Sequence, residues 1–343
     1  MKQTKRWRLS NDDTYNQKAI AEAANMLRDG MTVAFPTETV YGLGADATND
    51  RAVQRIFLAK GRPADNPLIA HVASKEQLLR LVATLPTYAE MLIDTFTPGP
   101  ITFVLPHNNT CARSTTAGLA TIGVRIPDHP VARALLQACD RPIAAPSANT
   151  SGKPSPTTAD HVWSDLHGKI SGLLDAGPAG VGVESTVIDC TEAIPVILRP
   201  GGITKEQLEQ VAGSVMVDPS LADKAQTPKS PGMKYRHYAP DVPLWLVKAS
   251  MTSMQQLIDR ERRKEKRVGV LAGSTTANQL KADRVVSLGD DIRSVAAHLY
   301  DGLRSFKEGD VDLIVCEAFP ETDIGQAVMN RLQKAASCLI EES

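Results

Sequence analysis

Apolar residues follow helical or strand spacing along most of the first 218 residues. Ile20, Ala23 and Leu27 lie on one face of a predicted helix that stops near Gly30. The predicted elements that follow are a strand at 31–35, a helix at 50–62, strands at 68–73, 101–105, 121–126, 141–146, 185–190 and 195–199, and a helix at 205–212. Neighbouring strands with intervening helices predict a twisted mixed-sheet α/β domain.

The polar, glycine-bearing segment 36–46 interrupts this pattern and is predicted to be a loop. The last hundred residues are more regular. Strands are predicted at 243–249, 267–273, 284–289 and 311–319, and they alternate with helices near 253–265, 275–281, 291–306 and 323–340. Strands and helices that alternate at short intervals predict a small Rossmann-like parallel sheet.

Residues 219–241 hold four prolines and little apolar periodicity, which is typical of a linker. The sequence therefore predicts a first domain at 1–218, a linker at 219–241 and a second domain at 242–343. Proline-bounded residues 230–240 concentrate two Tyr, a Lys, an Arg and a His. That composition suggests a lid over an active site.

The amino-acid composition excludes several classes of protein. The net charge is −1, and each predicted domain is close to neutral, with 20 basic against 22 acidic residues in 1–218 and 14 against 15 in 242–343. A general polyanion binder is therefore not expected. The five cysteines form no CxxC pair, which favours thiols in a reducing compartment. With no long apolar segment and no signal-peptide pattern, we expect a cytoplasmic protein without membrane contact.

Several loops next to predicted strands combine cations with hydroxyl or amide groups. Lys60, Arg62 and Asn66 lie at the end of a predicted helix, where two cations would also simply favour the helix dipole. The segment SANTSGKPSP (147–156) has the hydroxyls, backbone amides and cation of a phosphate or carboxylate receptor, although an ordinary turn explains it nearly as well.

Polar residues at the strands themselves have the same two interpretations. Arg125 and Arg199 in apolar strands are suited to bind a carboxylate or phosphate, or to form structural ion pairs. His71 is more often a buried core group than a ligand in such a strand. Thr37 and Thr39 follow a strand, where they either contact a polar ligand or cap a turn. Together these residues favour positioning and electrostatic catalysis on phosphate chemistry.

Common catalytic motifs are missing from the sequence. It has no GxxxxGK[ST] loop, no GxSxG elbow and no HExxH, and its seven histidines lack metal-ligand spacing. The glycines of DAGPAGVGVES precede a predicted strand rather than a helix, so a flexible turn is favoured over a dinucleotide site. No nucleophile and no metal bound by the protein itself are expected.

A series of uncommon motifs carries a family resemblance. They are FPTETVYGLGADA (35–47), KGRPADNPLIAHV (60–72), TPGPITFVL (97–105), TIGVRIPDHP (121–130), APSANTSGKPSPT (145–157), ESTVIDC (184–190), ILRPGGIT (197–204) and SPGMKYRHYAP (230–240). In this order they resemble the threonylcarbamoyl-AMP synthase family in its long form, with a YrdC-like catalytic domain and a C-terminal domain. The last hundred residues fit by position and element pattern only.

The resemblance implies that L-threonine, bicarbonate or CO2 and ATP give threonylcarbamoyl-AMP and pyrophosphate, for modification of adenosine beside the tRNA anticodon. Carried over by motif, the threonine-binding residues are Thr39, His71, Arg125, Ala145 and Ser185. The implied ATP-binding residues are Lys60, Arg62, Asn66, Thr121, Ser147, Asn149, Ser155, Arg199 and Tyr238. Lys60 and Arg62 would act electrostatically on the phosphates.

The resemblance further implies Mg²⁺ that enters with ATP and is held mainly by the phosphates. The product would pass to the machinery that transfers threonylcarbamoyl groups to tRNA, and any direct tRNA contact is expected to be weak. Two alternative functions were also considered for this sequence. A non-catalytic RNA-binding factor is disfavoured by the neutral charge and the 4% aromatic content. A related carbamoyl-transfer maturation enzyme is disfavoured by the lack of CxxC pairs.

Overall fold

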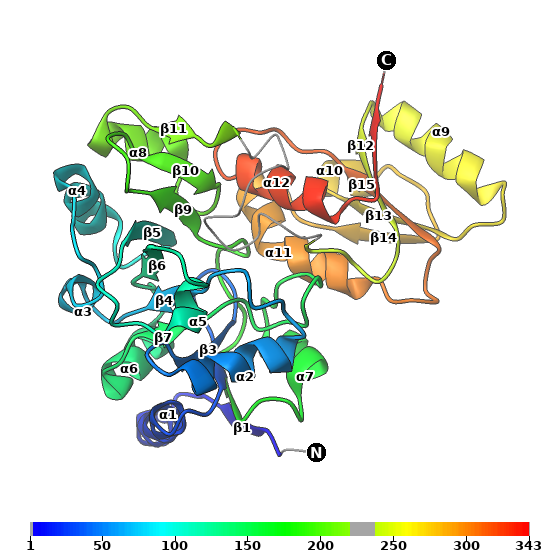
Figure 1. Ribbon diagram of the computed structural model, residues 1–343. Coiled ribbons are helices and arrows are strands. Elements are labelled where there is room, and N and C mark those ends of the chain that lie inside the picture. The colour runs from blue at the N-terminus through cyan, green and yellow to red at the C-terminus, as the bar shows by residue number, and fades with distance from the viewer. Residues whose placement is uncertain (1–2, 220–236, 343) are drawn as a thin grey trace. The chain divides into compact units, whose positions relative to one another are not determined.

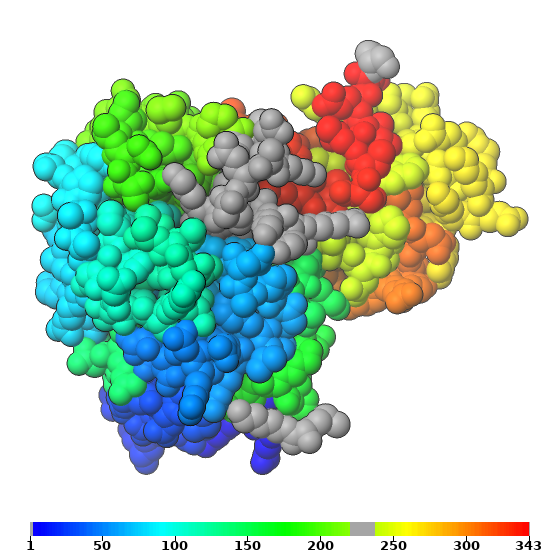
Figure 2. All heavy atoms as spheres, viewed as in Figure 1, coloured from blue at the N-terminus to red at the C-terminus, as the bar shows by residue number. Residues whose placement is uncertain are grey.

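The computed structural model describes residues 3–219 and 237–342, which form two compact units (Figure 1). The first unit comprises residues 3–151, 156–180 and 184–219 of this described part, and the second comprises 152–155, 181–183 and 237–342. Figure 2 shows the heavy atoms at the surface of the units in the same view. Among the described residues, no helix is both long and apolar enough to cross a membrane.

The first unit is built on a mixed sheet of eleven strands in the order β1-β8-β2-β3-β7-β4-β6-β5-β9-β10-β11. Its strands are β1 (Lys5–Arg8), β2 (Val33–Phe35), β3 (Gly42–Asp46), β4 (Ile69–His71), β5 (Ile101–Pro106), β6 (Thr121–Arg125), β7 (Ile143–Ala144), β8 (Gly172–Asp175), β9 (Thr186–Asp189), β10 (Val196–Arg199) and β11 (Met216–Val217). Its helices are α1 (Asp13–Arg28), α2 (Asp50–Lys60), α3 (Lys75–Leu79), α4 (Thr87–Phe96), α5 (Arg113–Thr116), α6 (Pro130–Cys139), α7 (Ala159–Leu166) and α8 (Lys205–Ala212). The predicted twisted mixed sheet is confirmed.

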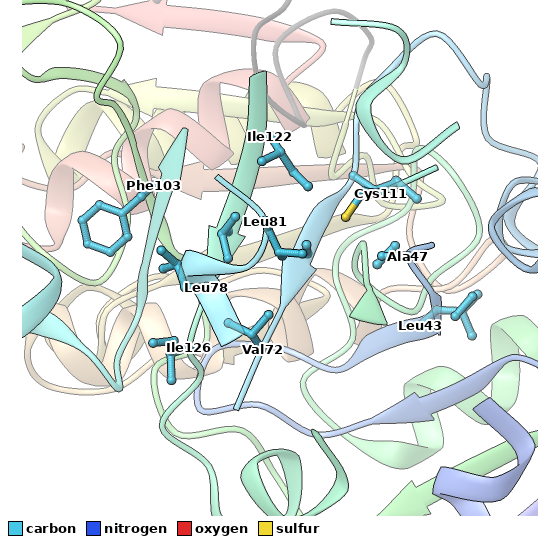
Figure 3. Packing of buried hydrophobic residues seen from close by; sticks show 14 of the residues in the cluster. Leu43, Ala47, Val72, Leu78, Leu81, Phe103, Cys111, Ile122 and Ile126 are labelled. Atoms are coloured by element: carbon cyan, nitrogen blue, oxygen red, sulfur yellow. The ribbon is translucent and has the colours of Figure 1, made fainter. Parts of the chain in front are cut away.

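Apolar side chains cover both faces of this sheet, because successive strand residues point to opposite sides. In β2, Ala34 joins the main apolar cluster with α2 and α4, whereas Val33 and Phe35 join a second cluster with α1 and α6. Figure 3 shows part of the main cluster, in which Phe103 and Ile122 lie among Leu78, Leu81 and other buried side chains. A sheet buried on both faces explains why its strands read as nearly continuous apolar runs.

The loop predicted at 36–46 is wrong in its second half, because Gly42–Asp46 is strand β3. This strand pairs antiparallel with both β2 and β7 and is fully buried. Glycine weakens a strand signal in the sequence, but here it permits close packing. A Cβ at Gly44 would lie 2.8 Å from Ile143 Cγ2 and 2.9 Å from Phe35 Cε1.

Replacing Gly44 with alanine should therefore lower the free energy of unfolding by about 1–3 kcal/mol, the usual cost of overpacking a core. Gly180→Ala is the matched control, because a Cβ there has only the Glu38 carbonyl oxygen nearby, at 3.9 Å. Urea unfolding of both variants measures the difference. Equal stability of the two variants would mean that the sheet adjusts freely around position 44.

The second unit contains a parallel sheet of five strands in the order β14-β13-β15-β12-β16, which confirms the predicted small parallel sheet. Its strands are β12 (Leu244–Lys248), β13 (Val268–Ala272), β14 (Arg284–Ser287), β15 (Leu313–Glu317) and β16 (Cys338–Glu341). Its helices are α9 (Met251–Arg262), α10 (Ser274–Ala277), α11 (Ile292–Ser305) and α12 (Gly325–Ala335). The helix predicted to run to residue 340 ends at Ala335, since residues 338–341 pair with β12 as a fifth strand.

All five cysteines are free thiols. Cys111, Cys139, Cys190 and Cys316 are buried, and Cys338 is exposed on the edge strand β16. Burial in apolar surroundings raises the pKa of the Cys111 thiol to about 12. The buried thiols are therefore inert packing groups rather than nucleophiles.

Candidate active site

The candidate site lies on one face of the central strands β4, β6 and β5. Alternation along these strands turns Ala70, Val124 and Phe103 into the main apolar cluster. The residues that alternate with these along each strand therefore point to the opposite face of the sheet. They are His71 on β4, Thr121 and Arg125 on β6, and Thr102 on β5. On that face, the cluster containing Phe35 lies toward β7, and Val104, Val187 and Leu198 form another cluster toward β10. Several of the predicted site residues thus share a polar strip between two apolar clusters.

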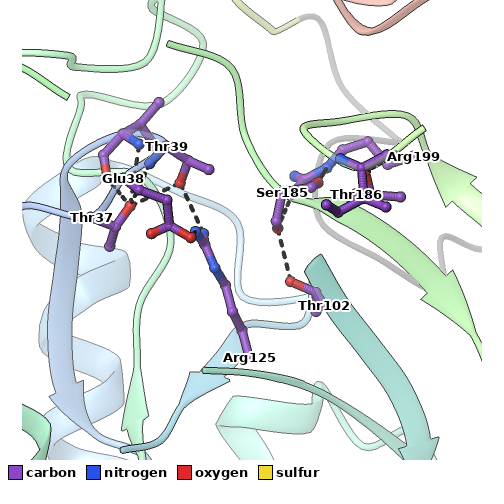
Figure 4. Close-up of polar contacts among 10 residues, drawn as sticks. Thr37, Glu38, Thr39, Thr102, Arg125, Ser185, Thr186 and Arg199 are labelled. Carbon is purple, nitrogen blue, oxygen red and sulfur yellow. Dashed lines mark hydrogen bonds and ion pairs between the residues drawn. The ribbon is translucent and has the colours of Figure 1, made fainter. Parts of the chain in front are cut away.

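Arg125 is the buried cation of this strip, with 4% exposure. Its Nη1 donates to Thr39 Oγ1 at 2.9 Å, and its Nη2 lies 2.6 Å from Glu38 Oε1 (Figure 4). Thr37 Oγ1 donates to the Val40 carbonyl and lies 2.8 Å from Thr39 Oγ1. Since the Thr37 proton is used, Thr39 must donate to Thr37, and this fixes a Thr39 lone pair toward Arg125. Thr37 and Thr39 therefore serve both as turn caps and as part of the site.

His71 is held as a neutral imidazole. It pairs in register with Arg125 across β4 and β6, and its ring meets Phe35 edge-on at 6.1 Å between centroids. Its Nδ1 lies 3.2 Å from the Ile69 carbonyl oxygen, which only accepts, so Nδ1 carries the proton and Nε2 is the acceptor. Burial, with a smaller contribution from the Arg125 charge, lowers the pKa of His71 to about 3.

This lowered pKa predicts a loss of stability on acidification. The native pKa lies below the ordinary value of about 6.5, so between these pH values the unfolded chain binds the extra proton and unfolding is favoured. From pH 7 to pH 5 the loss from His71 alone should be about 2 kcal/mol of unfolding free energy. In a His71→Gln variant, the difference between the two pH values should shrink by that amount in urea unfolding. An unchanged difference would show that His71 titrates normally in the folded protein.

Ser185 and Arg199 form a second polar group, joined to the strip by Thr102 (Figure 4). Arg199 is 5% exposed, and its Nε and Nη2 both donate to the Ser185 carbonyl, at 3.1 and 2.9 Å. Nη2 also donates to Ser185 Oγ, which lies 2.8 Å from Thr102 Oγ1. The backbone of Gly201 approaches so closely that a Cβ there would lie 2.3 Å from the Ser185 carbonyl carbon. Arg199 therefore fixes the position of Ser185.

Lys60 lies elsewhere in the first unit, at the end of α2, and is 2% exposed. Its Nζ donates to the carbonyl oxygens of Ser147 and, at 2.6 Å, of Asn149. Ser147 Oγ donates to Asn149 Oδ1 at 2.5 Å. The sequence predicts Lys60 at the end of a helix, and it is the last residue of α2, where it is buried. Its buried ammonium group bridges two carbonyls of the 147–149 loop.

The remaining predicted residues of the first unit lie at strand or loop positions. Arg62 Nη2 donates to the Asn66 and Pro67 carbonyls at 3.4 and 3.3 Å. Thr121 begins β6, and Ala145 donates its backbone N–H to the Ile69 carbonyl at 2.9 Å beside β7. Four sets of contacts thus unite predicted residues, namely Thr39 with Arg125, Ser185 with Arg199, Lys60 with Ser147 and Asn149, and Arg62 with Asn66.

Ser155 and Tyr238 belong to the second unit. Tyr238 is 5% exposed, stacks on Tyr300 with centroids 5.5 Å apart, and lies under the guanidinium of Arg331. Residues 220–236, which include most of the predicted linker and lid, lie outside the described residues.

Two residues of the site were not singled out from the sequence. Glu38 contacts Arg125, and Thr102 contacts Ser185. The signal for Glu38 was available, since it is the single charged residue among the hydroxyl and apolar residues of PTETVYGLG (36–44). In the sequence, Thr102 is one polar residue in an apolar strand, and no pattern marks it as a site residue. Its contact with Ser185 is visible only in the structure.

The chemistry of the site is that of a receptor for a small polar ligand. It presents one buried guanidinium paired with a carboxylate, one neutral imidazole acceptor and several oriented hydroxyls. Burial strengthens each of these electrostatic contacts relative to water. No group of three or more His, Cys, Asp or Glu side chains that could hold a metal ion occurs in the described part of the chain.

Comparison with known proteins gives matches over both units. A family described as "Telomere recombination" matches residues 25–201, and one described as "Threonylcarbamoyl-AMP synthase, C-terminal domain" matches residues 203–337. The threonylcarbamoyl-AMP synthase of Bacillus subtilis is 52% identical over 338 residues, which are 97% of this chain and 98% of that protein. The enzyme of the same name from Pyrococcus abyssi is 49% identical and covers 92% of this chain and 93% of that protein.

A solved structure is also similar. The crystal structure of Pyrococcus abyssi Sua5 complexed with L-threonine superposes with a TM-score of 0.92 at 46% identity, and the match covers 100% of both chains. The similarity therefore includes the second unit as well as the first.

Proposed function

This chain belongs to the threonylcarbamoyl-AMP synthase family, and from that premise we propose how its buried site carries out the synthesis. The reaction is that of a nucleotidyltransferase, which uses ATP to adenylate a threonylcarbamate. Two threonylcarbamoyl-AMP synthases are 52% and 49% identical to this chain over nearly its full length, and this similarity is the main evidence for the function. A non-catalytic RNA-binding factor and a carbamoyl-transfer maturation enzyme are therefore set aside.

L-threonine would be bound by Thr39, His71, Arg125, Ala145 and Ser185. The Arg125 guanidinium suits the substrate carboxylate, because its parallel N–H groups match two carboxylate oxygens. The neutral His71 suits the threonine hydroxyl, because its Nε2 is an acceptor. The relative from Pyrococcus abyssi, with L-threonine in its crystal structure, supports this choice of ligand.

Within the first unit, ATP would be bound by Lys60, Arg62, Asn66, Thr121, Ser147, Asn149 and Arg199. Lys60 and Arg62 would stabilise the charge on the phosphates without forming any covalent intermediate. Because Lys60 Nζ already bonds two carbonyls, part of its contribution is to hold the 147–149 loop in shape.

In the proposed sequence of steps, the threonine amine first adds to the carbon of CO2 and loses a proton to give a carbamate. Where bicarbonate is the source, it is dehydrated to CO2 and water is released. A carbamate oxygen then attacks the α-phosphorus of ATP, the bond from this phosphorus to the bridging oxygen breaks, and pyrophosphate leaves. The protein positions the two reactants and shields the unstable carbamate from water. Mg²⁺ would enter with ATP, held by the phosphates, and we assign it no ligand from the chain.

The product would be consumed by machinery that transfers the threonylcarbamoyl group to adenosine in tRNA. We place this work in the cytoplasm, which agrees with the free thiols. Incubation of the full-length protein with labelled bicarbonate, L-threonine and MgATP tests the function. Labelled threonylcarbamoyl-AMP and an equal amount of pyrophosphate should form, and omission of threonine should stop both. Pyrophosphate release that does not depend on threonine would contradict the proposal.

A further inference from the structure

Glu38 and Arg125 form a buried ion pair beside the strip of polar residues. The side chains are 14% and 5% exposed, and Glu38 Oε1 lies 2.6 Å from Arg125 Nη2. Figure 4 shows the Glu38 carboxylate next to the Arg125 guanidinium, on the side of the 37–39 loop. Two opposite charges in a buried place attract strongly, but they are stable there only when their hydrogen-bonding groups are also satisfied.

That second condition is not met among the described residues. Both carboxylate oxygens of Glu38 are buried without a hydrogen bond, and so are Nε and Nη2 of Arg125. Only Nη1 of Arg125 is used, in its bond to Thr39. Buried polar atoms are nearly always hydrogen-bonded, and exceptions point to a missing partner. Here the missing partner has to accept from a guanidinium and donate to a carboxylate at the same time.

An α-amino acid is a ligand of that kind, since it carries a carboxylate and an ammonium on one carbon. We propose that Glu38 is the receptor for the α-amino group of the substrate and that, with Arg125, it recognises the amino acid as a zwitterion. This inference rests on the proposed function and adds a residue to the threonine subsite. None of the threonine-binding residues inferred from the sequence carries a negative charge, so the amino group had no charged partner among them.

The same contact serves the reaction after the first step. The ammonium first loses one proton to become a nucleophilic amine, and the nitrogen loses a second proton as it bonds to the CO2 carbon; both protons pass to bicarbonate or solvent. The carbamate nitrogen keeps one N–H, which continues to donate to Glu38. The nitrogen is thereby held in one orientation while a carbamate oxygen reaches the α-phosphorus. The competing interpretation is that Glu38 merely holds the Arg125 side chain in place.

The two interpretations differ in how Glu38 responds to the ligand's amino group. We would titrate full-length wild type and Glu38→Gln by calorimetry with L-threonine and with (R)-3-hydroxybutyrate, which keeps the carboxylate and hydroxyl but lacks the amino group. The wild type should bind L-threonine about 10- to 100-fold more tightly than the analogue, as a charge-assisted hydrogen bond allows. In Glu38→Gln this preference should vanish, with affinity for the analogue unchanged or higher.

Equal weakening of both ligands by Glu38→Gln would overturn the proposal and leave Glu38 a structural partner of Arg125. A variant that binds both ligands as the wild type does would also overturn it. If Glu38→Gln fails to fold, the wild type still decides, because equal affinity for L-threonine and the analogue rules out a receptor for the amino group. Failure of the proposed function is separate, since it appears as a wild type that binds no L-threonine and makes no adenylate.

Discussion

Replacing Arg125 with methionine should abolish measurable L-threonine binding and lower the free energy of unfolding by about 3–5 kcal/mol. The guanidinium is buried against Glu38 and Thr39. Its removal takes away the proposed carboxylate contact and leaves the Glu38 charge buried without its partner. Calorimetric titration and urea unfolding measure the two effects.

Two further variants separate binding from stability. Arg125→Lys keeps the charge but loses the parallel N–H groups, and it should cost about 1–3 kcal/mol of threonine binding with little change in ATP affinity. The double variant Arg125→Met with Glu38→Leu removes both charges, so it should recover stability without recovering binding. Unaltered threonine affinity in Arg125→Lys would remove Arg125 from the carboxylate-binding role.

Lys60→Met should cause the second large effect, a loss of both stability and pyrophosphate release. The substitution removes the ammonium donor of two carbonyls, at a cost of about 1–3 kcal/mol for each carbonyl that is left buried without a partner. The 147–149 loop should loosen, and ATP binding should weaken with it. Thermal or urea unfolding and a threonine-dependent pyrophosphate assay measure the two losses.

Lys75→Met is the matched control, since Lys75 lies on α3 and pairs with the exposed carboxylates of Glu90 and Asp94. Surface pairs of this kind contribute little, so its unfolding free energy should change by less than about 1 kcal/mol. If Lys60→Met were as stable as this control yet lost activity, Lys60 would act on the phosphates alone. Wild-type stability together with wild-type activity would remove it from the site altogether.

Buried contacts between distant segments explain why sequence patterns could not predict the surroundings of several functional residues. Lys60 at the end of an amphipathic helix looks exposed, because helical spacing records which residues face the core but not which loop returns to cover the helix end. The covering loop comes from residues 147–149, almost ninety positions away in the chain. Similarly, Glu38 and Thr39 meet Arg125 only because the loop after β2 reaches β6.

Sequence alone determined the class of the periodic elements that it predicted, the mixed sheet of the first unit, the parallel sheet of the second, and the family, through motifs that lie in order along the chain. These features are local, since apolar spacing and turn residues set helix or strand within a few residues. Strand β3 and the ion pair between Glu38 and Arg125 were decided only by tertiary structure. Both depend on the close approach of segments that are distant in the sequence. There, the absence of a Cβ or the desolvation of a charge changes the free energy of folding by more than the local strand propensity does.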